Sequence, residues 1–170
     1  LKLKASSSGK VVAISVGPKT RVVDSLRTAL AMGADEAVVI DASENLDAYA
    51  TAKALAAAIK QEGGFDQVFT GKLAIDNNNS AVTQMLAEFL EIPHAVVVSK
   101  FESADGKTTV DREVEGGTKE VIELTGPSVV GANKGLNKPR YASLPGIMKA
   151  KKKPLKELSL ADLGVSAEDQ

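Results

Sequence analysis

The residue types that most often do chemistry are sparse in this chain of 170 residues. There is no cysteine, which excludes a thiol nucleophile, a disulfide framework and a zinc–thiolate site. The single histidine, His94, precedes a predicted strand and has no evident partner for metal binding or a Ser-His-Asp arrangement. Glu113 and Glu115 would share one face of a hairpin strand, where such carboxylates usually form solvated ion pairs. We predict no catalytic and no metal-binding residues.

The strongest candidate for ligand binding is a polar strand-to-helix junction, TGKLAIDNNNSAVTQM at 70–85. In open α/β sheets, ligands bind at the carboxyl ends of strands, where helix N-termini offer unpaired N–H groups to anions. Gly71 permits close backbone approach, the polar run 76–79 suits ribose or base, and 80–83 would supply amides and hydroxyls to phosphate. A well-capped helix explains the same residues, and the pattern alone favours that interpretation. Neither nucleotide-binding glycine motif, G-x-x-x-x-G-K-[ST] or G-x-G-x-x-G, is present.

A second candidate, NKPRYASLPGIMKAKKK at 137–153, combines apolar residues with a run of lysines. Its two prolines restrict the backbone, so less entropy is lost when the segment docks on a partner. Leu144, Ile147 and Met148 would then be apolar anchors, and the lysines a charged rim. A solvated lysine run is the ordinary alternative. Nucleic-acid binding usually needs more aromatic residues than the one tyrosine here, so we predict a protein partner and no nucleic acid.

Charge is segregated along the chain, although the formal net charge is only −1. Between Glu123 and Glu157 there are eight basic residues and no acidic one, which leaves 13 basic and 22 acidic residues elsewhere. Such segregation raises the encounter rate with an acidic partner and makes that rate salt-dependent. No run of 18 apolar residues exists, so we predict no membrane insertion.

The elements that must position these residues alternate through most of the chain, which predicts an α/β fold: three-layer, Rossmann-like, with a mainly parallel sheet and an added β-hairpin. The predicted strands lie at 11–17, 36–41, 65–71, 94–99 and 127–132. The predicted helices lie at 20–35, 45–64 and 77–93, the last capped by one of its Asn or Ser residues. The hairpin lies at 107–124, on either side of Gly116-Gly117.

The length fits one compact domain. From Gly135 onward we predict a loop, a basic segment and a mobile tail. The first ten residues have the pattern of a helix end, so we expect a further segment before Leu1.

Six stretches resemble, in order, the beta subunits of electron transfer flavoproteins: AISVGP, SLRTALAMGAD, TGKLAID, DREVEGG, LNKPRYASLPGIMKAKKKP and ADLG. The resemblance covers nearly the whole chain, and residues 136–153 are its most specific part. It implies an adenine nucleotide alpha hydrolase-like fold and an electron carrier subunit, not an enzyme. Such a subunit forms a heterodimer with an alpha subunit, which holds most of the FAD. The pair accepts electrons from acyl-CoA and related dehydrogenases of fatty acid β-oxidation and passes them to a quinone-linked oxidoreductase.

The resemblance implies a structural AMP in this subunit. Its binding residues would be Val16, Gly71, Lys72, Leu73, Ala74, Ile75, Asp76, Asn77, Asn78, Asn79, Ser80, Ala81 and Val82. The last three depart from the Asn-Gln-Thr of many members, so backbone amides would replace side-chain contacts to the phosphate. In electron-bifurcating relatives a second FAD occupies this place, and the lysine-rich segment favours the non-bifurcating type.

The resemblance also implies a partner recognition loop at 136–154, between a nucleotide-binding domain at 1–135 and the start of a C-terminal arm at 155–170. Leu144 would enter an apolar pocket of the dehydrogenase, and Lys149 and Lys152 match lysines that are methylated in some members. The other partner-binding residues would be Pro145, Ile147, Met148 and Glu113, the last holding the mobile FAD domain in a resting orientation. The family works in the bacterial cytoplasm or the mitochondrial matrix.

One competing hypothesis is a nucleotide-binding domain of the universal-stress type, which has a similar sheet and no electron transfer. A basic nucleic-acid module is the least favoured alternative.

Overall fold

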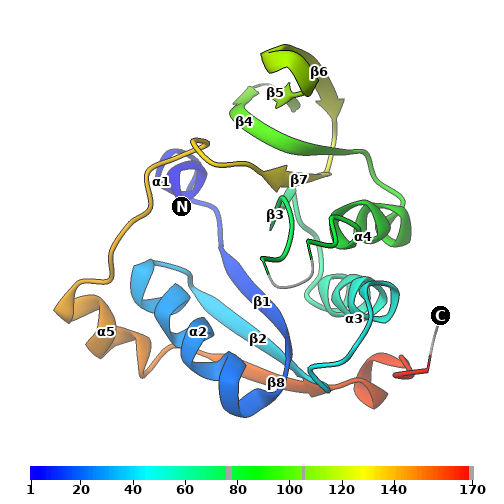
Figure 1. Cartoon of the computed structure of the whole chain (residues 1–170). Coiled ribbons are helices and arrows are strands. Elements are labelled where there is room, and N and C mark those ends of the chain that lie inside the picture. Colours follow the sequence, from blue (N-terminus) through cyan, green and yellow to red (C-terminus); the bar gives the residue numbers. More distant parts are fainter. Residues whose placement is uncertain (76–77, 105, 169–170) are drawn as a thin grey trace. The chain divides into compact units, whose positions relative to one another are not determined.

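The computed structural model describes residues 1–75, 78–104 and 106–168 (Figure 1). The chain forms two compact units. Unit 1 comprises Leu1–Ala50 and Pro139–Gln170, and unit 2 comprises Thr51–Lys138.

Unit 1 contains a three-stranded parallel sheet in the order β1-β2-β8. Its strands are β1 (Val12–Gly17), β2 (Glu36–Asp41) and β8 (Leu155–Ser159). The central strand β2 is the apolar run EAVVID, and its residues Ala37 to Ile40 are buried, as expected for a parallel strand with a neighbour on each side. Val12 lies opposite Glu36, and Ala37 lies opposite Leu155. The sheet therefore joins two segments that are far apart in sequence.

The helices of unit 1 are α1 (Lys2–Ser7), α2 (Lys19–Met32) and α5 (Leu144–Ala150), with a 3₁₀ turn η2 (Ala161–Leu163). Helix α2 buries Val22, Leu26 and Leu30, which recur every fourth residue and pack in the core of the unit. Gly33 ends this helix with φ of 127°, a left-handed conformation that favours glycine.

Unit 2 contains a five-stranded sheet in the order β3-β7-β4-β5-β6. Its strands are β3 (Gln67–Gly71), β4 (His94–Ala104), β5 (Lys107–Glu113), β6 (Lys119–Thr125) and β7 (Ser128–Ala132). The pairs β3-β7 and β7-β4 are parallel, whereas β4-β5 and β5-β6 are antiparallel. The predicted hairpin is therefore confirmed, with the 3₁₀ turn η1 (Glu115–Gly117) between β5 and β6. Glu115 lies in this turn and not on a strand, so our placement of both glutamates on one strand face was wrong.

Helix α4 (Val82–Leu90) contacts β7 and β4 in unit 2, and α3 (Ala48–Gln61) crosses the boundary between the units. Strand β4 leaves β7 and pairs with β5 through register shifts between Ala95 and Lys100. Val97, inside this irregularity, has φ of 61°, which is strained for a β-branched residue.

The α/β class, with mostly parallel sheets, is confirmed, although the strands form two sheets and not one. Two local predictions were wrong. The stretch after Gly135, expected to be loop and tail, contains helix α5 and strand β8. Helix α4 has Ala81 at its N-cap and not an Asn or Ser side chain.

Candidate functional site

Helix α5 carries an exposed apolar face. The exposed fractions of its three members are 79% for Leu144, 73% for Met148 and 45% for Ile147. These residues stand at positions i, i+3 and i+4 of one helix, which places them side by side. The helix starts at Ser143, whose hydroxyl accepts a 3.1 Å hydrogen bond from the Gly146 N–H. We call Leu144, Ile147 and Met148 the α5 apolar face.

Residues outside the α5 apolar face attach α5 to α2. Ala150 is 3% exposed and belongs to the core of unit 1. A Cβ added at Gly146 would lie 2.5 Å from the Ala31 carbonyl oxygen, so only glycine lets the two helices approach this closely. The hydrophobic pattern of α5 is therefore inverted: its small residues contact the protein and its large ones contact solvent.

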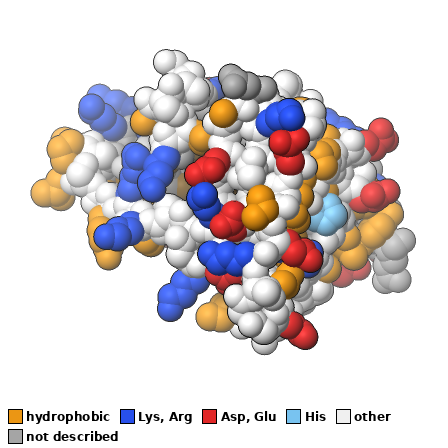
Figure 2. All heavy atoms as spheres, turned by 90° about the horizontal axis from the view of Figure 1, so that it is seen from above, with side chains coloured by type: hydrophobic (Ala, Val, Ile, Leu, Met, Phe, Trp, Pro, Cys, Tyr) orange, Lys and Arg blue, Asp and Glu red, His pale blue; other side chains and the backbone are white. Residues whose placement is uncertain are grey.

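The lysine run around α5 divides into two roles. Lys149, Lys151 and Lys152 are exposed, as expected for a charged rim. The ammonium of Lys153 instead donates to the backbone carbonyls of Leu30, in α2, and Ala34, just after it, so our assignment of the whole run to the rim was wrong for this residue. Figure 2 shows hydrophobic and basic side chains together at the left margin of the view, the side on which Figure 1 draws α5.

The second candidate, the loop predicted to bind a nucleotide, follows β3 in unit 2. Among the predicted residues, Asp76 and Asn77 lie outside the described part of the chain. Exposed residues dominate the rest: Gly71, Leu73, Ala74, Ile75, Asn78, Asn79 and Ser80 are exposed, and Lys72, Ala81 and Val82 are half-buried. The loop is tied to its own unit by the Lys72 N–H, which donates to the Ala132 carbonyl at 3.0 Å.

The hydroxyl groups of this junction are engaged by the chain itself. The Ser80 hydroxyl donates to the Lys72 carbonyl at 2.9 Å, and the Thr83 hydroxyl lies 2.8 Å from that of Thr70. Ala81, at the start of α4, has no side-chain acceptor to cap the helix. The first backbone amides of α4 are therefore the groups best suited to an anion here.

Val16 and Glu113 lie in different units. Val16 is half-buried in β1 of unit 1, opposite Ile40 of β2. Glu113 ends β5 of unit 2, where its carboxylate accepts a 2.6 Å hydrogen bond from the Asn133 side-chain amide. His94 is exposed at the first residue of β4.

The side chains whose pKa values are shifted take part in contacts that hold the fold together. The pKa of Asp35 is lowered, chiefly by a hydrogen bond from the Lys4 side chain and then by one from the Val11 N–H. The pKa of Lys19 is raised, chiefly by its hydrogen bond to Glu157. No group of three or more acidic, histidine or cysteine side chains suited to a metal ion occurs within the described ranges.

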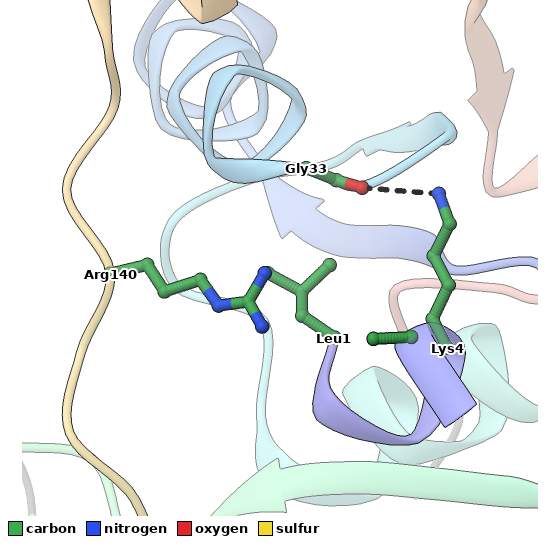
Figure 3. A pocket seen from close by; sticks show the side chains of 5 residues that line it. Leu1, Lys4, Gly33 and Arg140 are labelled. Carbon is green, nitrogen blue, oxygen red and sulfur yellow. Dashed lines mark hydrogen bonds between the residues drawn. The ribbon is translucent and has the colours of Figure 1, made fainter.

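Two pockets contain none of the predicted binding residues. In unit 1, a pocket is lined by Leu1, Lys4, Ala5, Gly33 and Arg140, with the Arg140 side chain pointing toward Leu1 (Figure 3). In unit 2, another is lined by Gln84, His94, Ala95, Val96, Arg112 and Ile122.

For the residues described, no helix has both the length and the apolar character needed to cross a membrane.

Comparison with known proteins adds independent evidence. The model of the electron transfer flavoprotein domain matches residues 1–163. The "Electron transfer flavoprotein subunit beta" of Methylophilus methylotrophus is 43% identical over 175 residues, covering 99% of this chain and 66% of that protein. The protein of the same name from Bacillus subtilis (strain 168) is 43% identical over 172 residues, with the same two coverages. The "Electron transfer flavoprotein subunit beta, mitochondrial" of Oryza sativa subsp. indica is 45% identical over 166 residues, covering 95% of this chain and 64% of that protein.

A match over nearly the whole chain shows that it belongs to the electron transfer flavoprotein family. Within that family, the relatives named above are beta subunits, and it is to these that the chain is similar. The chain spans about two thirds of their length.

Proposed function

We propose that this chain acts as the beta subunit of an electron transfer flavoprotein and docks dehydrogenases through the α5 apolar face. The observation that carries the proposal is the 79% exposure of Leu144 at the start of a helix fixed to the protein by its opposite side. Large apolar side chains that stay in solvent together often mark an interaction site. The exposed Lys149, Lys151 and Lys152 beside them suit a partner with an acidic surface.

The strength of this contact suits a carrier that must release its partner after each transfer. Burying one leucine side chain contributes about 1.5–3 kcal/mol. Because about 1.4 kcal/mol changes an equilibrium constant tenfold, Leu144 would change affinity by roughly tenfold to a hundredfold. Such a contribution is large for a transient complex and small enough to allow dissociation.

In the proposed cycle this chain supplies docking and not chemistry. Its partner would be an alpha subunit that holds most of the FAD, the group that accepts the electrons. Acyl-CoA and related dehydrogenases would deliver the electrons, and a quinone-linked oxidoreductase would receive them. Glu113 would keep the mobile FAD domain in its resting orientation, for which its position at the end of β5 and its bond to Asn133 provide a fixed carboxylate.

The loop from Gly71 to Val82 would bind a structural AMP. The uncapped start of α4 fits a phosphate, because unpaired amides and the helix dipole both favour an anion. The heterodimer should therefore release AMP on heating, as identified by mass spectrometry. Release of a second FAD would assign the loop to the electron-bifurcating type instead, and release of no nucleotide would contradict the proposed site.

The docking proposal is tested by Leu144→Ala in the heterodimer. We expect reduction of the flavin by an acyl-CoA dehydrogenase, measured at subsaturating dehydrogenase, to slow by about tenfold or more, with the flavin content unchanged. The matched control is Val121→Ala on β6, where an apolar side chain is 71% exposed outside the α5 apolar face. Equal reduction rates for Leu144→Ala and wild type would overturn the proposal.

The competing universal-stress hypothesis predicts that the purified protein differs in colour and in subunit composition. A nucleotide-binding domain without electron transfer would purify colourless and without a larger second subunit. Flavin absorbance and a co-purifying alpha subunit are the outcomes expected here.

A further inference from the structure

Helix α5 is too short to be stable without contacts to the rest of the protein. It has seven residues, whereas isolated helices shorter than about 12–15 residues are marginal in water. Helices in proteins usually gain stability by burying their large apolar residues, but those of α5 face solvent. Apart from the small Ala150, apolar burial therefore contributes little to fixing the helix, and polar contacts must add to it.

The first cation that fixes α5 comes from α2. The Arg27 Nη1 donates to the carbonyl oxygens of Ala150 and Lys153, at 2.8 and 3.0 Å. Ala150 is the last residue of α5, where helix carbonyls lack partners within the helix. A positive charge at this end also interacts favourably with the negative end of the helix dipole.

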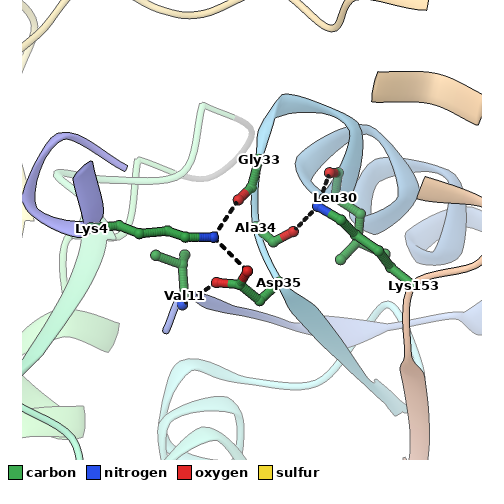
Figure 4. A network of polar contacts seen from close by, with 7 residues as sticks. All are labelled: Lys4, Val11, Leu30, Gly33, Ala34, Asp35 and Lys153. Carbon is green, nitrogen blue, oxygen red and sulfur yellow. Dashed lines mark hydrogen bonds and ion pairs between the residues drawn. The ribbon is translucent and has the colours of Figure 1, made fainter. Parts of the chain in front are cut away.

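The second cation runs in the opposite direction. The Lys153 ammonium donates to the Leu30 carbonyl, in the last turn of α2, at 3.0 Å and to the Ala34 carbonyl, two residues after the helix (Figure 4). Helix α2 has no basic residue in its own last turn, so this charge comes from the segment after α5. Each helix end thus receives a cation from the other side of the contact.

We propose that Arg27 and Lys153 form a reciprocal clasp that positions the α5 apolar face for docking. The clasp comprises these two side chains and the four carbonyls that they bind. Neither residue needs to touch the dehydrogenase, because the clasp acts by holding Leu144, Ile147 and Met148 in one orientation. Preordered side chains lose less entropy on binding, which raises affinity without a new contact. The inference rests on the proposed docking function and names the residues that position it.

The clasp differs from the rim in its dependence on salt. Exposed rim lysines act on a partner through solvent, where ions screen them within about 8–10 Å at 0.10–0.15 M ionic strength. The clasp bonds are short, direct contacts within a half-buried part of unit 1 and are screened much less. Measurements at low and high ionic strength should therefore distinguish the effects of rim substitutions from those of clasp substitutions.

The test compares Lys153→Met and Arg27→Met with the rim control Lys152→Met, each in the heterodimer. For the clasp variants we expect the apparent KM for an acyl-CoA dehydrogenase to rise about tenfold at both low and high salt, with kcat unchanged. For Lys152→Met we expect a rise at low salt that disappears at high salt. Amide hydrogen exchange of 144–150, measured without dehydrogenase, should accelerate about tenfold in the clasp variants and stay unchanged in Lys152→Met.

The outcomes separate the clasp from the docking function on which it rests. If Leu144→Ala lowers docking but Lys153→Met behaves like Lys152→Met in both measurements, the clasp is wrong and docking stands. If α5 exchange accelerates while the KM of every variant is unchanged, positioning for docking is wrong. Should Lys153→Met fail to fold, Lys153→Gln, whose uncharged side-chain amide can still donate, is measured in its place. Unchanged exchange in both Lys153→Gln and Arg27→Met would overturn the clasp.

Discussion

Asp35 shows how one carboxylate stabilises unit 1. It accepts hydrogen bonds from the Lys4 ammonium and from the Val11 N–H, the latter at 2.8 Å, and so joins α1, the start of β1 and the turn after α2 (Figure 4). Both bonds favour the ionised carboxylate, which is why the pKa of Asp35 is lowered. A group whose pKa is lower in the folded state stabilises the fold while it is ionised.

We therefore predict that the free energy of unfolding falls as pH drops through the lowered pKa of Asp35. The contribution of Asp35 is complete above the ordinary aspartate pKa of about 3.9, and Asp35→Asn should reduce the acid-dependent loss. Denaturant unfolding of both proteins between about pH 2 and 7 measures this difference. Asp24→Asn, at an exposed position on α2, serves as the control. Parallel pH profiles for Asp35→Asn and wild type would refute the assignment.

The sequence was sufficient to predict the placement of some single residues and not of others. Leu144 was predicted as an exposed anchor, and its exposure agrees, because two prolines and a lysine run are unusual neighbours for a core leucine. The inward direction of Lys153 could not be predicted, since its partners are carbonyls of Leu30 and Ala34, more than a hundred residues away. Every residue has a backbone carbonyl, so the sequence does not show which carbonyl a distant lysine will bind.

At the level of elements, the packing of α5 on α2 depends on the absence of a side chain at Gly146. We predict that Gly146→Ala destabilises this contact, because the added Cβ would lie 2.5 Å from the Ala31 carbonyl oxygen. Overpacking of this kind typically costs about 1–3 kcal/mol. Thermal unfolding should give a lower Tm for the variant.

The matched control for this prediction is Gly64→Ala. A Cβ at Gly64 meets nothing within 4 Å, and this glycine is outside the positive-φ set. Substitution there should leave Tm unchanged or raise it slightly, since alanine restricts the unfolded chain. A Tm for Gly146→Ala equal to that of the control would show that the helices adjust without cost.

Local pattern identified the elements whose own residues bury a face. Strand β2 was predicted at its observed bounds because EAVVID is an apolar run after a helix stop. Helix α5 escaped prediction because its large residues face solvent, which inverts the usual pattern. Strand β8 escaped because a five-residue strand gains its stability from pairing with β2, a partner that is distant in sequence. The cap of α4 was missed because the Ser80 hydroxyl bonds Lys72 and not the helix.

At the scale of the whole molecule, the segregated charge predicts a salt-dependent encounter with the dehydrogenase. Lys149→Gln with Lys152→Gln should lower the rate of flavin reduction at low ionic strength and flatten its decline with added salt. Stopped-flow measurements over a salt series test this expectation. Lys2→Gln, an exposed lysine outside the basic segment, is the control of equal charge per site. A salt slope unchanged in the double variant would remove these lysines from the docking mechanism.

The discontinuity of unit 1 has a consequence for biosynthesis. Strand β2 pairs with β8, so the three-stranded sheet cannot close until the ribosome has released residues 155–159. Unit 2 is one continuous stretch, Thr51–Lys138, and is translated in full before then. Because domains generally fold as units during translation, unit 2 should mature first, while β1 and β2 wait with an unpaired edge. During that interval the unpaired edge of β2 is open to pairing with another chain.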